Sequence, residues 1–104
     1  MSEQLSERAS REAQKLEDEV DSFHDIEYMD AQVRANIDGT LSSVRILTEF
    51  GGPNVWIKTN GRSMSVLVAQ GSDHHTAAVF DRQDLVDQMW DYFSMQWRNA
   101  EPEA

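Results

Sequence analysis

Cysteine is absent from this chain of 104 residues. Its absence excludes disulfide bonds, thiolate metal sites and cysteine nucleophiles, and it fits a reducing compartment. No uninterrupted apolar stretch approaches the ~20 residues that a membrane helix needs. The first residues, Met-Ser-Glu-Gln-Leu-Ser-Glu-Arg, are acidic and polar and do not resemble a signal peptide. We therefore expect a cytoplasmic protein that makes no contact with a membrane.

Sequence patterns typical of catalysis are also missing. There is no His-Glu-x-x-His pattern, no Gly-x-Ser-x-Gly elbow and no glycine loop of the kind that holds phosphate. Asp73-His74-His75 could supply metal ligands, but adjacent side chains diverge on a strand and no cysteine or nearby glutamate completes a set of four. His24 is similarly isolated. We predict a protein that is not an enzyme and has no cofactor and no metal site.

Lysine is scarce, with only two residues, and the net charge is −10. The acid lies in the two ends of the chain: residues 1–31 carry ten carboxylates and three cations, and residues 81–104 carry six and two. The middle, residues 32–80, carries three carboxylates and four cations. A concentrated negative surface repels nucleic acid and anionic membranes and attracts basic proteins. This distribution favours a basic protein as the partner and argues against direct binding of nucleic acid.

The length corresponds to one domain, residues 1–104, and its first segment, 2–24, is predicted to be an acidic helix. Ser2 can cap this helix, and no glycine or proline interrupts it. Apolar residues recur along it every three or four positions, at Ala9, Ala13, Leu16, Val20 and Phe23. The stripe is narrow. The helix is therefore expected to dock weakly on its own domain, to pair with a second copy, or to await a partner.

Residues 25–37 fit either a helix or a strand, but Asp38-Gly39 before another alternating segment indicates a hairpin and favours a strand. The second strand is predicted at 42–50. Gly51-Gly52-Pro53-Asn54 ends it, since two glycines free the backbone and the proline removes a donor. The apolar face of this strand is predicted to comprise Val44, Ile46, Thr48 and Phe50.

A third strand, 55–59, precedes Asn60-Gly61, the strongest turn signal in the chain. A two-residue loop here would place Ile57 opposite Met64, and Val55 opposite Val66. The fourth strand is predicted at 63–70, followed by a loop at 71–76. A short edge strand is possible at 76–80.

The segment 81–99 is predicted to be the amphipathic core helix. Asp81 is expected to open it, with Asp84 completing an imperfect capping box, and Trp90 is expected to lie where the core is thickest. Its wide apolar stripe comprises Leu85, Val86, Met89, Trp90, Tyr92, Phe93 and Trp97. Residues 100–104 form an acidic tail. The predicted fold is α+β, with a four- or possibly five-stranded antiparallel sheet at 31–80 and a helix at each chain end.

Carboxylates form a row on the last helix. Asp84, Asp87 and Asp91 lie within about 60° around its axis, at about one charge per turn and about 5–6 Å apart. Duplex DNA spaces its charge comparably. The first helix would add to this negative surface with Glu12, Glu17, Asp18, Glu19 and Asp21. The alternative is a solvated helix face, although a surface that serves solubility alone usually mixes both signs of charge.

Trp56 is predicted to lie on the sheet face opposite to Val55 and Ile57. If the first helix covers that face, Trp56 belongs to a second core; otherwise it is an exposed anchor for a protein interface. Four cations can lie near it, namely Arg34, Arg45, Lys58 and Arg62. They make a poor site for nucleic acid in so acidic a chain. We expect them to meet the acidic helices of their own fold.

One segment carries a resemblance to other proteins: Val44-Arg45-Ile46, then Phe50-Gly51-Gly52-Pro53-Asn54-Val55-Trp56-Ile57-Lys58-Thr59. Over residues 25–97 the chain resembles small acidic proteins of unknown function carried by bacterial prophages and plasmids, which share a Gly-Gly-Pro-Asn-aliphatic-Trp-aliphatic core. Those proteins often have aromatic residues after the hairpin, where this chain has Val66, Leu67 and Val68. The resemblance implies a mobile element in a bacterial host cytosol. Acidic, non-enzymatic proteins of such elements include inhibitors of restriction and CRISPR systems that imitate DNA.

We therefore predict an acidic interaction protein that imitates the charge of nucleic acid and inhibits a basic host defence protein that binds nucleic acid. The residues expected to contact this partner are Asp84, Asp87, Asp91, Glu12, Glu17, Asp18, Glu19, Asp21 and Trp56. The alternative is a regulatory or structural homodimer that assembles through the N-terminal helix and inhibits nothing. A small enzyme or ligand-binding protein is the third possibility.

Overall fold

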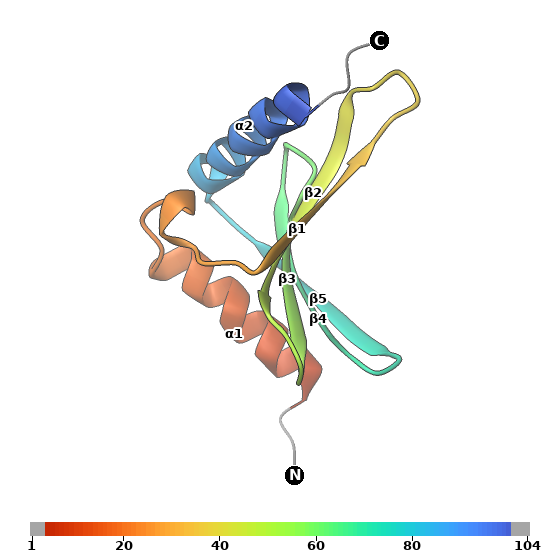
Figure 1. Cartoon of the computed structure of the whole chain (residues 1–104). Coiled ribbons are helices and arrows are strands. Elements are labelled where there is room, and N and C mark those ends of the chain that lie inside the picture. Colours follow the sequence, from red (N-terminus) through yellow and green to blue (C-terminus); the bar gives the residue numbers. More distant parts are fainter. Residues whose placement is uncertain (1–3, 101–104) are drawn as a thin grey trace.

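The computed structural model describes residues 4–100 and confirms the α+β fold, with five strands, the larger of the two predicted numbers (Figure 1). The predicted cap at Ser2 and residues 101–104 of the predicted tail lie outside the described residues. The elements, in chain order, are α1 (Leu5–Asp18), the short 3₁₀ helix η1 (Phe23–Asp25), β1 (Asp30–Ala35), β2 (Leu41–Glu49), β3 (Asn54–Thr59), β4 (Met64–Gln70), β5 (Asp73–Val79) and α2 (Gln83–Ala100).

The five strands form an antiparallel meander in which each strand pairs with its neighbour in sequence. Both helices cover the same face of this sheet: α1 packs against β4 and β5, and α2 lies over β2 and β3 (Figure 1). One core lies between the helices and this face. Its buried strand residues are Val44, Ile46, Val55, Ile57, Met64, Val66, Val68 and Val79. We call this side of the sheet the covered face and the other side the open face.

The hairpin at Asn60-Gly61 differs from the predicted two-residue turn. Thr59 pairs with Met64, so the loop contains four residues, and Ile57 lies opposite Val66 rather than Met64. The Asn60 side-chain oxygen accepts hydrogen bonds from the backbone N–H groups of Arg62 and Ser63, at 2.9 and 3.0 Å, which stabilises the wider loop. The pairing of β3 with β4 is therefore shifted by two residues from the predicted pairing. Because side chains alternate with a period of two, every residue keeps its predicted face.

The tight turn of this sheet lies between β4 and β5 instead. Gln70 pairs with Asp73, which leaves a two-residue loop of Gly71-Ser72, with Gly71 at φ +62°. Glycine adopts this left-handed conformation without steric cost, which makes Gly-Ser a suitable hairpin loop. The predicted loop at 71–76 is therefore wrong, because β5 already begins at Asp73. His74 and His75 fall on opposite faces of this edge strand and are exposed.

The hairpin at Asp38-Gly39 is confirmed, and residues 30–35 form a strand rather than a helix. An Asp38 side-chain oxygen accepts hydrogen bonds from the Thr40 hydroxyl and backbone N–H, which lowers the pKa of Asp38. At the other end of β2, the register shifts between Leu47 and Glu49. The strand ends there, so Phe50 is 72% exposed and does not join the predicted apolar face.

Helix α1 ends at Asp18, well before the predicted residue 24. Ala9, Ala13 and Leu16 are nonetheless buried, so the helix docks on its own sheet, and the two alanines are small enough to let it lie close. Phe23 is also buried, although η1 carries it. Its ring centroid lies 5.9 Å from that of Phe93 on α2.

Helix α2 begins at Gln83, and the predicted capping box does not form. Asp81 adopts φ +59°, outside the helix, and the Asp84 carboxylate pairs with Arg82. The core is thickest at Leu85 and Met89, which are both 0% exposed, and not at Trp90. Trp90 is half-buried beside Gly61, where an added Cβ would come within 3.0 Å of the indole ring.

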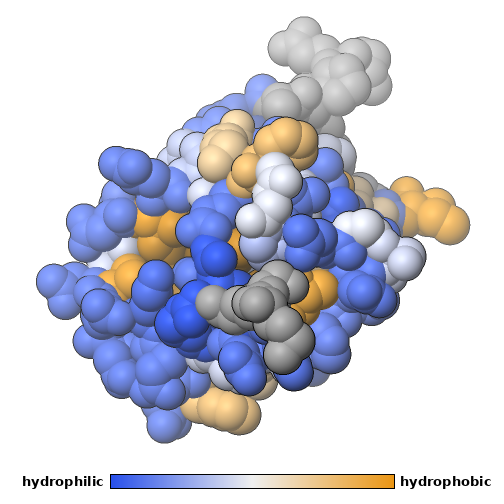
Figure 2. Space-filling model, turned by 90° about the horizontal axis from the view of Figure 1, so that it is seen from below, coloured by the Kyte–Doolittle hydropathy of each residue, from blue (hydrophilic) through white to orange (hydrophobic). Residues whose placement is uncertain are grey.

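Some large apolar side chains remain exposed, but those on the face seen in Figure 2 are separated by hydrophilic surface. Isolated apolar residues of this kind are normal on a protein surface. The exposed large apolar residues are Tyr28, Met29, Val33, Ile37, Phe50, Phe80 and Met95. Within residues 4–100, no helix is both long enough and apolar enough to span a membrane.

Candidate interaction surfaces

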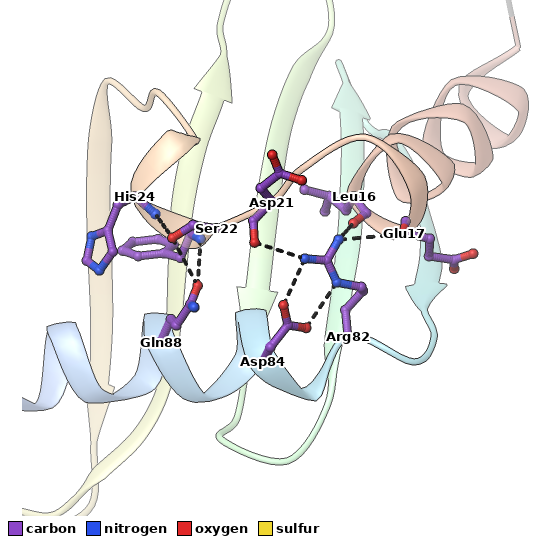
Figure 3. Close-up of polar contacts among 9 residues, drawn as sticks. Leu16, Glu17, Asp21, Ser22, His24, Arg82, Asp84 and Gln88 are labelled. Carbon is purple, nitrogen blue, oxygen red and sulfur yellow. Dashed lines mark hydrogen bonds and ion pairs between the residues drawn. The ribbon is translucent and has the colours of Figure 1, made fainter.

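Arg82 joins the end of α1 to the start of α2 (Figure 3). Its Nε and Nη2 donate to the two carboxylate oxygens of Asp84, at 3.0 and 2.9 Å, and its Nη1 donates to the Leu16 carbonyl. That carbonyl belongs to the last turn of α1, where a helix lacks partners for its C=O groups and attracts positive charge. One guanidinium therefore links the two helices.

The Arg82–Asp84 pair shifts the ionisation of both groups. The hydrogen bonds from Arg82 lower the pKa of Asp84, and the hydrogen bond to Asp84 raises the pKa of Arg82. A bidentate pair between arginine and a carboxylate has the geometry that favours charge-assisted hydrogen bonding. Asp84 therefore stays ionised in the fold and serves mainly to hold Arg82.

Gln88 makes a second joint between α2 and the segment that follows α1 (Figure 3). Its side-chain oxygen accepts hydrogen bonds from the Phe23 backbone N–H at 2.7 Å and from the Ser22 hydroxyl at 3.3 Å. The Ser22 hydroxyl oxygen also accepts from the His24 N–H. These contacts hold η1, which is only three residues long, and the residues next to it against α2.

The two joints bring together carboxylates that are far apart in the sequence. The backbone carbonyls of Glu17 and Asp21 accept from Arg82 at 3.5 Å, so these two acidic residues lie close to the Arg82–Asp84 pair while their own carboxylates point away from the guanidinium (Figure 3). Asp18 and Glu19 complete the end of α1 and are exposed, as are Asp87 and Asp91 on α2. We call this surface, formed by α1, residues 19–25 and α2, the helical layer. The structure thus gathers on it the predicted acidic residues of both helices.

Several of these carboxylates already have partners within the fold. Glu12 pairs with Arg8 at 3.0 Å and with Lys15 at 3.4 Å. Glu17 accepts a hydrogen bond from the Phe80 backbone N–H at 3.0 Å, and Asp18 accepts one from the Gln14 side chain. Glu12, Glu17 and Asp84 thus have structural roles.

Trp56, the remaining predicted contact residue, is not in the helical layer. It lies half-buried on the open face, in a row across the sheet with Leu47 and Leu67. The Arg45 guanidinium lies 4.2 Å above its ring, an arrangement typical of a cation–π contact. Within residues 4–100 no helix covers this face, so Trp56 does not belong to a second core beneath α1.

The cations of the sheet also lie on the open face. Arg45 on β2 lies opposite Lys58 on β3. Arg34 on β1 lies opposite Ser43, which is two residues from Arg45 on β2 and on the same face. The expectation that these three would meet the acidic helices is wrong, because the helices cover the other face of the same strands. Arg62 is exposed in the loop that follows β3. The molecule therefore presents two charged surfaces, a negative helical layer and an open face on which cations predominate.

Comparison with protein families, curated proteins and solved structures gave no match. In the part of the chain that the structure describes, no group of three or more His, Asp or Glu side chains is placed to hold a metal ion. The sequence offered little sign of the joints at Arg82 and Gln88. Both depend on partners more than 60 residues away.

Proposed function

We propose that this chain is a non-enzymatic acidic protein that imitates the charge of nucleic acid and so inhibits a basic, nucleic-acid-binding protein of a bacterial cytosol. One observation carries this proposal: the carboxylates of both helices share one surface, while the unpaired cations of the sheet lie on the opposite face. A protein that used its charge only for solubility would usually mix the two signs.

The excess of carboxylates over cations in the helical layer gives this surface a negative electrostatic potential. Residues 5–27 carry eight carboxylates and three cations. Two of those cations, Arg8 and Lys15, are paired with Glu12. Around α2, Arg82 is paired with Asp84, and the helix itself carries Arg98 in its last turn. The exposed carboxylates that remain therefore act on solvent and on any approaching protein with little compensation, and a basic protein would be steered towards them.

The row on α2 provides the phosphate-like spacing. Asp87 and Asp91 are exposed and one helical turn apart, and Glu19 and Asp21 add charge from the segment after α1. Asp87 accepts a hydrogen bond from Gln83 at 2.9 Å, which orients its carboxylate without neutralising it. We propose these four residues as the main contacts. Trp56 lies on the other face and is not part of this surface.

The test is a pull-down from a bacterial lysate with a double charge reversal, Asp87→Lys with Asp91→Lys. The matched control, Asp30→Lys with Asp73→Lys, changes the net charge equally but lies outside the helical layer. The wild type and the control should capture basic proteins that handle nucleic acid, and the captured proteins should elute between about 50 and 200 mM salt. The double reversal should lose them, because each desolvated charge pair can couple by more than about 1 kcal/mol.

Inhibition is tested on a captured protein. Its affinity for DNA should fall when the wild type is added and should be unaffected by the double reversal. Capture of the same proteins by both reversals, or a captured set without nucleic-acid-handling proteins, would contradict the proposal. A salt-tolerant dimer with no such partner would instead support a homodimer. The apolar stripe of α1, however, is buried against its own sheet, so such a dimer would need another surface.

A further inference from the structure

We infer that the open face holds a separate site for a small oxyanion of the phosphate class, between β1, β2 and β3. This site goes beyond the proposed function, which uses the helical layer. It lies in a hollow of about 200 Å³ whose lining residues include Gln32, Arg34, Ser43, Arg45 and Lys58, together with Val33 and Val44. A neighbouring hollow of about 280 Å³ shares Ser43 and Lys58 and continues to Ser65.

The first argument is the absence of counter-ions at this hollow. Among the described residues, no carboxylate forms an ion pair with Arg34, Arg45 or Lys58. The chain has 19 carboxylates for nine Lys and Arg residues, so partners are plentiful. On the helical layer, by contrast, Arg8 and Arg82 are paired with carboxylates. Three neighbouring cations, none of them paired with a carboxylate of the described residues, are therefore available to an external anion.

The second argument is the pairing of like charges. Arg45 and Lys58 are direct cross-strand partners on β2 and β3. Like charges directly opposite each other destabilise a sheet, whereas opposite charges stabilise it. An anion bound between the two side chains would remove this repulsion and would be held by both.

The third argument is that Arg45 is already oriented. Its Nε and Nη2 donate to the Gln32 side-chain oxygen at 2.9 and 2.6 Å, and its guanidinium is supported by the Trp56 ring. A guanidinium has five N–H donors, so three remain for a ligand. Its planar fork matches the oxygen geometry of phosphate, and the Ser43 hydroxyl in the same lining is a further donor. The side chain loses little freedom when an anion binds.

The size and charge of the site favour a small anion over a nucleic-acid strand. Three cations can neutralise one phosphate group, while a strand carries a charge at every nucleotide and meets a molecule of net charge −10. The negative helical layer would repel the rest of the strand. The ligand is therefore a free phosphate or a small molecule with a phosphate group.

The test is a titration of the ¹⁵N-labelled full chain with inorganic phosphate, followed by NMR at an ionic strength held constant with chloride. Saturable shifts should appear on the amides of β1, β2 and β3 and on the Trp56 indole N–H. Lys58→Gln should weaken binding about tenfold or more, and Lys58→Arg should restore it. Lys15→Gln, which removes a cation from the helical layer, is the matched control and should bind as the wild type does.

Shifts that do not saturate, or that are the same in Lys58→Gln, would overturn the site. Titrations with pyrophosphate and with a twelve-nucleotide oligo-dT separate the sources of the phosphate group. Tighter binding of pyrophosphate than of phosphate supports a small ligand, whereas tighter binding of the oligonucleotide on this face would overturn the inference in favour of nucleic acid. Lys58→Gln should capture the same lysate proteins as the wild type, because Lys58 lies outside the helical layer. A negative phosphate titration would therefore overturn the anion site and leave the proposed function unaffected.

Discussion

On β3, Val55, Ile57 and Thr59 point into the core and are at most 4% exposed, whereas the alternating residues Trp56 and Lys58 are half-buried on the open face. The two faces come from the same six residues, Asn54–Thr59. One face excludes water beneath the helices, and the other keeps Trp56 and Lys58 partly in contact with solvent. A single strand thus supplies both the core and a charged surface.

The charges of this protein separate because of where the helices lie. The helices bring their apolar stripes to the covered face, so their carboxylates must point outward on that side. The sheet then stands between these carboxylates and the cations of the open face, which prevents neutralisation. Segregation of charge therefore follows from placing both helices on one face, and the joint at Arg82 helps to keep them there.

The largest expected effect tests the contrast between the faces directly. Leu85→Ala should lower the free energy of unfolding by ~2–5 kcal/mol, because it removes a fully buried side chain and leaves a cavity. Leu67→Ala, the same change on the open face, should cost only about 1 kcal/mol, because Leu67 is already half-exposed. Urea unfolding measures both. Equal costs would mean that the open face is covered in solution.

A smaller effect is expected from enlarging a residue between α1 and the sheet. Ala13→Leu should destabilise the fold by ~1–3 kcal/mol, because Ala13 is 3% exposed and extra methyl groups have no room there. Ser10→Leu, at an exposed position of the same helix, should change stability by less than about 0.5 kcal/mol. Thermal and urea unfolding compare the two variants. A neutral Ala13→Leu would show that α1 does not pack closely on β4 and β5.

The smallest effect concerns the joint that holds both helices over one face. Arg82→Gln should cost ~1–2 kcal/mol near neutral pH, because it leaves the Leu16 carbonyl without a charged donor and frees Asp84. The pKa of Asp84 is held below its ordinary value of 3.8 by Arg82, so it should rise towards that value in the variant. Carbon-detected NMR titration of the Asp84 carboxylate measures the change.

The direction of the pH dependence follows from that lowered pKa. A carboxylate whose pKa is lower in the folded than in the unfolded state stabilises the fold above its unfolded pKa and loses this contribution as the pH falls through the folded value. The stability difference between wild type and Arg82→Gln should therefore be constant near neutral pH and shrink below about pH 4. A difference that grows in acid would show that Arg82 acts through another partner.

Much of the fold was predictable because its signals are local. The alternation along β2 to β4, the hairpin at Asp38-Gly39 and the apolar spacing of α2 each involve residues within a few positions of one another. The predicted two-residue turn at Asn60-Gly61 is wrong because the Asn60 side chain accepts two backbone hydrogen bonds and stabilises a wider loop. The predicted place of Phe50 on the apolar face is wrong because β2 ends at Glu49, after a register shift.

Of the proposed interaction residues, the sequence alone determined that Asp87 and Asp91 share a helix face, because 3.6 residues per turn place them together. The sequence also determined which residues of each strand lie on the same side. Only the tertiary structure decided which side the helices would cover, and hence that Trp56 and Arg45 would face solvent. The physical reason is that alternation defines two faces equally well, and the choice between them depends on contacts between distant segments. The Leu16 carbonyl and Arg82, 66 positions apart, make one such contact.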